Sequence, residues 1–346
     1  MGMPTFTTRF LLGVALLAAA AKSASAIAEA STAACAPMSG AAIRDKYFDS
    51  DWARQDGAAI DDAPNPPGLP AADGGQGLYA VHELQAHASI TSVAYQLYAA
   101  RLNGGGELGE YLPDVLAGAH DEDGSDMTPW GEWIPELRHF WDSTKGPFQG
   151  LFGCDSAVNR AQKYFTGGYG LDGAYDVGWS ENAGKYRGQK GQGILYLYAH
   201  GDKHKAYWYL GHVAHLLEDL TVPAHALLWP HPFDGDAYER YMGAHYAEWA
   251  ALPPGPLESF DSLYDLFYQT AFVTGGYDAG VGPGPMAGAD GRNDRGARRA
   301  GGFTEAKLRE EGDVLMPLAY RKVAALFLFF SGQVNRVPIE SFTLGT

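Results

Sequence analysis

The segment His215-Leu-Leu-Glu-Asp219-Leu-Thr-Val-Pro223-Ala-His225 places three potential metal ligands in one short stretch of the chain. His215 and Asp219 are four residues apart, so a helix would put both side chains on one face, close enough to bind the same cation. Pro223 favours the end of that helix, because proline lacks a backbone N–H and restricts the residue before it. His225 can then turn towards the same site. A buried helix with one polar pair is the plainer interpretation, but the second histidine favours a metal site.

Long helical patterns surround this segment. Apolar residues recur at helical spacing from 81 to 101, without internal Gly or Pro. Residues 190–222 predict two helices broken near Gly201, and residues 304–331 predict a long helix bent at Pro317. These helices should supply the core around the metal-binding segment.

The stretches between the helices are rich in Gly, Pro and Asp. Residues 55–76, 165–193 and 275–302 have this composition and predict loops. The chain shows no alternation of apolar and polar residues strong enough to build a sheet, and no internal repeat. The sequence therefore predicts an all-α fold, as a single mostly helical domain with long loops.

The first residues have the features of a secretory signal peptide. Arg9 precedes an apolar run from 10 to 21, and Ala24-Ser25-Ala26 provides a small-residue cleavage site. The run is too short to span a bilayer, and no later stretch was expected to do so. We therefore expect an exported protein, secreted or periplasmic.

The expected domain organisation has four parts. Residues 1–26 are expected to form the signal peptide, 27–76 a loop-rich extension, 77–335 the helical domain that carries the candidate site and 336–346 a tail. In an oxidising compartment the two cysteines, Cys35 and Cys154, could form one disulfide.

The chain is strongly acidic. Its formal net charge is −16, from 25 Lys and Arg against 41 Asp and Glu. A nucleic-acid partner bound through its phosphates draws on clustered Lys and Arg, so nucleic acid is not the expected partner. An anionic substrate would need bound metal to meet it.

Further metal ligands must come from outside the segment, because three residues do not complete a site for several zinc ions. Asp236 and Glu239 are three residues apart and would share one face of a helix, and His231 competes with them. Other candidates are His87, His139 and the acidic run at 121–123. By contrast, His204, His212 and His245 are expected to be solvated or packing residues, and Phe140, Trp141 and Trp208 to be core residues.

At this point the chain resembles the bacterial zinc-dependent phospholipases C, which share their fold with fungal single-strand nucleases. Residues 202–211, leading into the segment 215–225, look like the central helix and ligand motif of that family. Residues 86–90, 118–123 and 139–142 look like its first ligand helix, its glycine-led loop with an aspartate, and its His-Phe-aromatic-Asp segment. The match covers roughly residues 80–250, with the C-terminal helix in addition.

The resemblance implies a site for up to three zinc ions in an enzyme that hydrolyses phosphate esters. By position, one zinc would be held by Asp123, His139, His215 and Asp219, a second by Asp219 as a bridge with His87, and a third by His225 and Glu239. Imidazole and carboxylate suit zinc, and a carboxylate can bridge two cations. Asp123 is the candidate general base.

The chain departs from the family pattern at the second zinc. Family members place an N-terminal tryptophan on this ion, but the expected mature start, Ile27, lies some sixty residues before His87. The missing ligand could be His82, a residue of the 55–76 loop, or a new N-terminus made by a later cut.

Two more positions stay open. The histidine that the family places one turn before the glutamate of the third zinc aligns with Gly235, so Asp236 or His231 would have to replace it. In the acidic run, Asp121 is an alternative to Asp123.

The expected function is that of an exported zinc-dependent phospholipase C that cleaves the glycerol-side phosphate ester of phospholipids at a membrane surface. A nuclease on the same scaffold is the second hypothesis, disfavoured by the net charge and by Leu220-Thr221-Val222 inside the motif. The third is an exported protein that metal stabilises without catalysis.

Overall fold

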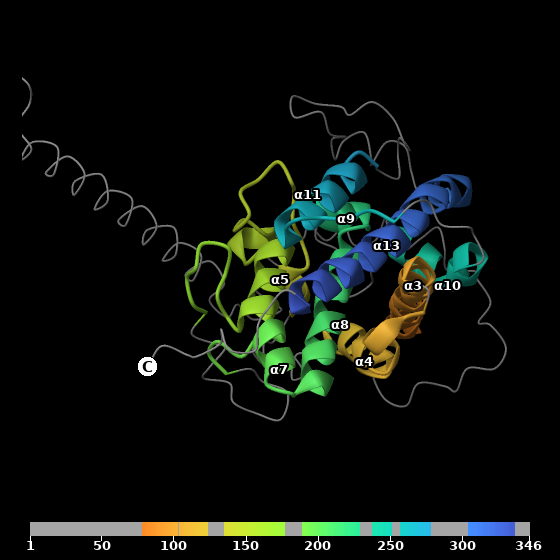
Figure 1. The fold of residues 1–346 in the computed structure, drawn as a ribbon. Helices are drawn as coiled ribbons and strands as arrows, with labels where there is room; N and C mark the ends of the chain where they lie inside the picture. Colours follow the sequence, from red (N-terminus) through yellow and green to blue (C-terminus); the bar gives the residue numbers. More distant parts are fainter. Residues whose placement is uncertain are drawn as a thin grey trace, which may run out of the picture.

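The computed structural model describes residues 78–102, 104–123, 135–176, 189–228, 237–250, 257–277 and 304–335. This part of the chain folds into packed helices (Figure 1) and contains no strand, only an isolated bridge between Tyr169 and Tyr175. The prediction of an all-α fold is confirmed.

The helices follow one another with short 3₁₀ turns between them. In chain order they are α3 (Leu78–Arg101), η1 (Gly106–Gly109), α4 (Leu112–Asp121), η2 (Pro135–Arg138), η3 (Leu151–Gly153), α5 (Ala157–Thr166), α7 (Ile194–Ala199), α8 (Lys203–Asp219), α9 (Pro223–Ala226), α10 (Ala237–Ala250), α11 (Leu263–Thr274) and α13 (Glu305–Val334). The three predicted helical regions correspond to α3, to α7 with α8, and to α13. Sequence patterns did not reveal α4, α5, α10 or α11.

Helix α8 lies in the centre of the bundle and is buried without interruption from 206 to 219. It begins at Asp202, whose carboxylate caps the helix by accepting the Lys205 N–H. It ends at Asp219, so Pro223 does not terminate it as expected. Pro223 instead opens α9, at a position where its missing N–H costs no hydrogen bond.

Helix α4 crosses α8 at two glycines. A Cβ on Gly118 would overlap the backbone carbonyl of Trp208, and a Cβ on Gly211 would overlap that of Val115. The two backbones can approach this closely only without side chains at both positions. The expected glycine-led loop at 118–123 is therefore wrong in its first part, since Gly118 belongs to α4 and Asp121 ends that helix.

Helix α13 packs against α3, α10, α11, α8 and α7, and runs along the bundle in Figure 1. Thr304 caps its first turn and Pro317 lies within the helix, while the expected bend at Pro317 stays a prediction. By length and composition α13 could cross a membrane, so the statement that no stretch after residue 26 has these properties was wrong. Most of its apolar window is buried inside the fold, as expected for a core helix.

Several predictions fall on residues outside the described part. The signal peptide at 1–26, the extension at 27–76, the tail at 336–346 and most of the 275–302 loop all do so. Cys154 is buried and disulfide-bonded, while Cys35, the other cysteine of the sequence, also lies outside that part. The domain boundaries stay predictions.

Candidate metal centre

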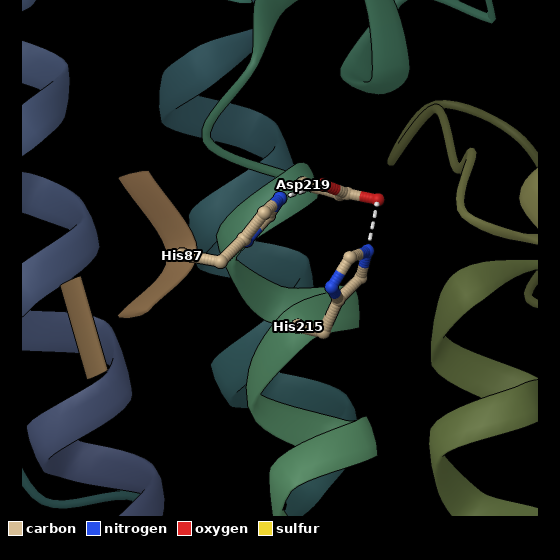
Figure 2. A group of neighbouring side chains, drawn as sticks. All are labelled: His87, His215 and Asp219. Carbon is tan, nitrogen blue, oxygen red and sulfur yellow. Dashed lines mark ion pairs between the residues drawn. The ribbon is translucent and has the colours of Figure 1, made fainter. Parts of the chain in front are cut away.

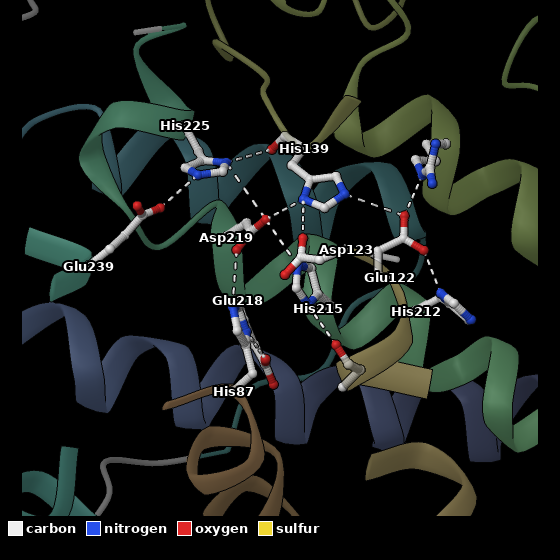
Figure 3. A network of polar contacts seen from close by, with 12 residues as sticks. His87, Glu122, Asp123, His139, His212, His215, Glu218, Asp219, His225 and Glu239 are labelled. Atoms are coloured by element: carbon white, nitrogen blue, oxygen red, sulfur yellow. Dashed lines mark hydrogen bonds and ion pairs between the residues drawn. The ribbon is translucent and has the colours of Figure 1, made fainter. Parts of the chain in front are cut away.

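Asp219, the last residue of α8, is the point at which four histidines converge (Figure 3). Its Oδ2 lies 2.7 Å from His139 Nδ1, 3.3 Å from His215 Nε2 and 3.7 Å from His225 Nδ1. Its Oδ1 lies 3.4 Å from His87 Nε2. The two oxygens of one carboxylate therefore face different histidines, which is the arrangement a bridging ligand needs.

Two groups of side chains have the spacing to hold a metal ion. One is His87, His215 and Asp219 (Figure 2), and the other is Asp123, His139 and His215. In each group the three ligand atoms lie within 4.8 Å of one another. Helix α3 contributes His87, α8 contributes His215 and Asp219, and the segments after α4 and η2 contribute Asp123 and His139. Residues from four separate parts of the chain thus meet around Asp219.

The ring of His215 is oriented by the backbone of α4. Its Nδ1 lies 2.6 Å from the carbonyl oxygen of Ala119, so Nδ1 carries the proton and donates it there. Its Nε2 faces Asp123 Oδ1 at 3.3 Å and Asp219. Burial lowers the pKa of His215, but these two carboxylates outweigh burial and raise the pKa well above its usual value, so a proton or a metal ion at Nε2 is favoured. This Nε2 is buried and makes no hydrogen bond among the described residues.

The ring of His139 lies between Asp219 and Glu122, and its short contact is the one to Asp219. Its Nδ1 faces Asp219 and, at 3.6 Å, Asp123, while its Nε2 faces Glu122 Oε1 at 3.6 Å. Burial alone lowers the pKa of His139, but its hydrogen bonds to Asp219 and Glu122 outweigh this and raise the pKa to about 9. A cation of some kind, proton or metal, is thus favoured between His139 and the two aspartates.

The third ring, His87, is held by Glu218. Its Nδ1 lies 2.6 Å from Glu218 Oε2, and the other oxygen of Glu218 accepts a hydrogen bond of 2.7 Å from Thr91. Its Nε2 is left to face Asp219. His87 and His215 thus share one arrangement, in which an acceptor holds Nδ1 and Nε2 faces a carboxylate, whereas His139 faces carboxylates with both nitrogens.

This arrangement fits a metal ion. A ring nitrogen with a lone pair repels a carboxylate unless a proton or another cation lies between them. Imidazole nitrogens and carboxylate oxygens are the usual zinc ligands, and histidine ligands typically give their second nitrogen to a carboxylate or backbone carbonyl. The residues around Asp219 therefore have the chemistry of a zinc site.

His225 and Glu239 form a separate pair beside this centre. His225 Nε2 lies 2.9 Å from Glu239 Oε1, and the His225 ring stacks on Phe140 at 4.2 Å between centroids. Within the described ranges these two residues do not belong to a group of three close metal-binding side chains. The third zinc stays a prediction that needs a further ligand. Two candidates for that ligand, His231 and Asp236, lie outside the described residues.

The acidic run at 121–123 separates into three roles. Asp121 faces Trp208 and His120 rather than the histidines around Asp219: its Oδ2 accepts a 2.9 Å hydrogen bond from Trp208 Nε1, and its Oδ1 lies 3.1 Å from His120 Nδ1. Asp123 contacts His215 and His139, so the geometry favours it over Asp121 as the ligand. His82 is part of α3, but its side chain lies outside the described part of the structure.

Glu122 is a residue of the candidate site that sequence reasoning did not single out. It is fully buried and contacts Arg160, Tyr164 and His212 in addition to His139. Burial raises the pKa of its carboxyl, but the charges of Arg160 and His212 and the hydrogen bonds of His139 and His212 hold that pKa well below its usual range. Its place in a run of three acidic residues was the only available signal.

The remaining expectations concern histidines and aromatic residues near the centre. Phe140, Trp141 and Trp208 are buried, as expected for core residues. His204 and His245 are more exposed, with partly exposed acidic partners. His212 is a packing residue rather than a solvated one, stacked on Tyr164 beside Glu122.

Comparison with known proteins gives little further information. No protein-family model matches the chain, and no curated protein sequence matches it. Among solved structures, the alpha-toxin of Clostridium perfringens from avian strain SWCP is similar, with 13% sequence identity and a TM-score of 0.40. The match covers 74% of this chain and 63% of the toxin chain. The chain thus spans less than two thirds of the toxin's length.

Proposed function

We propose that this protein is a zinc-dependent phosphodiesterase of the phospholipase C type. The observation that carries the proposal is the shared carboxylate of Asp219, with His87 on one oxygen and His139 and His215 on the other. A carboxylate between two sets of ligands suits a pair of cations, and paired cations are typical of phosphoryl-transfer hydrolases. The resemblance of the ligand segments to the zinc-dependent phospholipases C supports the same class.

The overall reaction is hydrolysis of the ester bond between phosphorus and the glycerol oxygen. Water adds to phosphorus, the P–O bond to glycerol breaks, and a proton passes to the glycerol oxygen to give diacylglycerol and a phosphorylated head group. In such sites, zinc ions lower the pKa of water and neutralise charge on the phosphoryl oxygens.

Asp123 is the residue that we assign to proton transfer. Its side chain is 32% exposed, whereas Asp219 and Glu122 are almost fully buried. Burial raises the pKa of Asp123, but the nearby His215 and His139 outweigh burial. The net effect is a pKa below the usual value, so the carboxylate is ionised at neutral pH. An ionised carboxylate at the exposed side of the cluster can accept a proton from an incoming water.

The acidic side chains around the candidate site support the proposal that it binds cations. Carboxylates of Asp123, Asp219, Glu122, Glu218 and Glu239 surround the histidines, and a phosphodiester is itself an anion. A metal-free cluster of this kind would repel the substrate. Bound cations therefore serve both the fold of the site and the approach of substrate.

The substrate and the location extend the proposal. A phospholipid at a membrane surface is the substrate that the family resemblance favours, and the leader-like residues 1–26 favour secreted or periplasmic protein.

The test is hydrolysis by the purified protein with zinc, before and after chelation. We expect phosphatidylcholine in detergent micelles to yield diacylglycerol and phosphocholine, with activity lost on chelation and restored by zinc. Activity that persists without metal would contradict the proposal. Cleavage of single-stranded DNA without lipid hydrolysis would favour the nuclease, and zinc binding with neither activity would favour a metal-stabilised protein.

A further inference from the structure

Glu218 precedes the shared carboxylate of Asp219 in the chain, yet it points to a different partner. Its side chain is fully buried, and its two oxygens contact two residues of α3, His87 at 2.6 Å and Thr91 at 2.7 Å. His87 and Thr91 are four residues apart, so they lie on the same face of that helix. One carboxylate of α8 therefore holds two consecutive turns of α3.

These contacts determine which nitrogen of His87 faces the metal centre. Thr91 has a hydroxyl proton to donate to Oε1, and Oε2 accepts the proton on His87 Nδ1. A neutral imidazole protonated at Nδ1 has its lone pair at Nε2. That nitrogen lies 3.4 Å from Asp219 Oδ1 and belongs to the group His87, His215 and Asp219.

Glu218 and Glu122 are both buried carboxylates, but they have different kinds of partners. Glu122 contacts the guanidinium of Arg160, the hydroxyl of Tyr164 and the ring of His212. For Glu218, the described residues include no Lys or Arg partner, and its contacts are the hydroxyl of Thr91 and the ring of His87. Its negative charge therefore acts mainly on His87, which makes Nε2 a stronger donor to a cation.

We propose that Glu218 is the positioning residue of His87, fixing its ring with Nε2 towards Asp219 and strengthening Nε2 as a zinc ligand. The proposal rests on the metal centre of the proposed function. It adds a residue outside the ligand set and assigns it an effect on metal affinity rather than contact with substrate.

The test separates orientation from charge with two substitutions. Glu218→Gln keeps an oxygen that can accept from His87 Nδ1 but removes the charge, whereas Glu218→Ala removes both. We expect zinc affinity, measured by competition with a chromophoric chelator, to fall by about 10–100-fold in Glu218→Ala and by less in Glu218→Gln. Zinc content per chain after dialysis should fall in the same order.

Glu107→Gln is the matched control, because it makes the same chemical change in a partly exposed carboxylate paired with Lys203, away from the histidines. Its zinc affinity should equal that of the wild type. Wild-type affinity in both Glu218 variants would overturn the inference and leave the proposed function standing. If Glu218→Ala does not fold, the result for Glu218→Gln decides.

Measurements on the wild type distinguish failure of the proposed function from failure of the proposed role of Glu218. A wild-type protein that binds zinc but hydrolyses no phosphodiester contradicts the proposed function, while the affinities of the variants still decide the role of Glu218. A wild-type protein that binds no zinc overturns both.

Discussion

Gly118 of α4 and Gly211 of α8 lie against each other where the two helices cross, and a Cβ on Gly211 would come within 2.8 Å of the Gly118 Cα. This approach has a consequence for the metal centre. Ala119, the next residue of α4, places its carbonyl oxygen 2.6 Å from His215 Nδ1. The glycine contact therefore sets the distance at which the backbone of α4 orients His215, a proposed metal ligand.

Gly211→Ala should destabilise the protein and weaken its metal centre. The added methyl would overlap the Val115 carbonyl, so the helices must separate. Overpacking of this kind costs up to about 3 kcal/mol in the free energy of unfolding. Urea unfolding measures the loss, and zinc affinity should fall with it because Ala119 moves from His215.

Gly332→Ala is the control for the same substitution in open space. A Cβ at Gly332, in the last turns of α13, would meet no atom within 4 Å. Alanine there should leave stability unchanged or raise it by up to about 1 kcal/mol. Equal effects of the two substitutions would mean that the helix crossing does not depend on Gly211.

Glu122→Gln should lower the free energy of unfolding, because it removes the buried negative charge that is paired with Arg160. The side chain of Arg160 is 0% exposed, and in this variant it loses the ionised carboxylate of Glu122. Breaking a buried ion pair on one side costs about 3 kcal/mol or more. Glu248→Gln is the control, because Glu248 and Arg309 are 37% and 54% exposed and such exposed pairs contribute little to stability. Thermal unfolding of both variants compares them, and equal losses would contradict a role for Glu122 in the core.

The free energy of unfolding should depend on pH partly through the ionisation of Lys163. Its Nζ lies 2.5 Å from Asp155 and 3.0 Å from Asp176. Burial lowers the pKa of Lys163, but these two carboxylates outweigh burial and raise it. A raised folded-state pKa contributes stability that is complete below the unfolded value of about 10.4 and is lost as pH rises above it.

Lys163→Met removes this charge and therefore tests its contribution to the pH dependence of stability. Urea unfolding of both proteins from neutral to alkaline pH should show a smaller stability difference between wild type and variant above about pH 10.4. A difference that stays constant across that range would show that the two ion pairs do not shift the pKa of Lys163.

The local part of the metal centre could be predicted from sequence. His215 and Asp219 are one helical turn apart, so their shared face follows from helix geometry alone. The predicted helices around them were long and strongly apolar. The short helix α4 does not follow from the sequence pattern, because Gly118 is typical of a loop, whereas in the structure it allows a helix crossing that no local pattern reveals.

The residues that orient the ligands depend on distant contacts. Glu218 reaches His87 across 131 positions of the sequence, and Glu122 reaches Arg160 across 38. The choice between Asp121 and Asp123 depends on Trp208, which is 87 positions from Asp121. Neighbouring carboxylates look equivalent in a sequence, and only the packing of α3, α5 and α8 distinguishes them.

The central claim is that Asp219 shares its carboxylate between two zinc ions. Zinc per chain, measured by elemental analysis after dialysis of the wild type and of Asp219→Asn, tests it most directly. We predict at least two zinc ions in the wild type, and in Asp219→Asn a loss of affinity larger than the roughly 10–100-fold typical of residues outside the ligand set. A wild type with fewer than two bound zinc ions, or a variant that keeps the wild-type zinc content and affinity, would contradict the account.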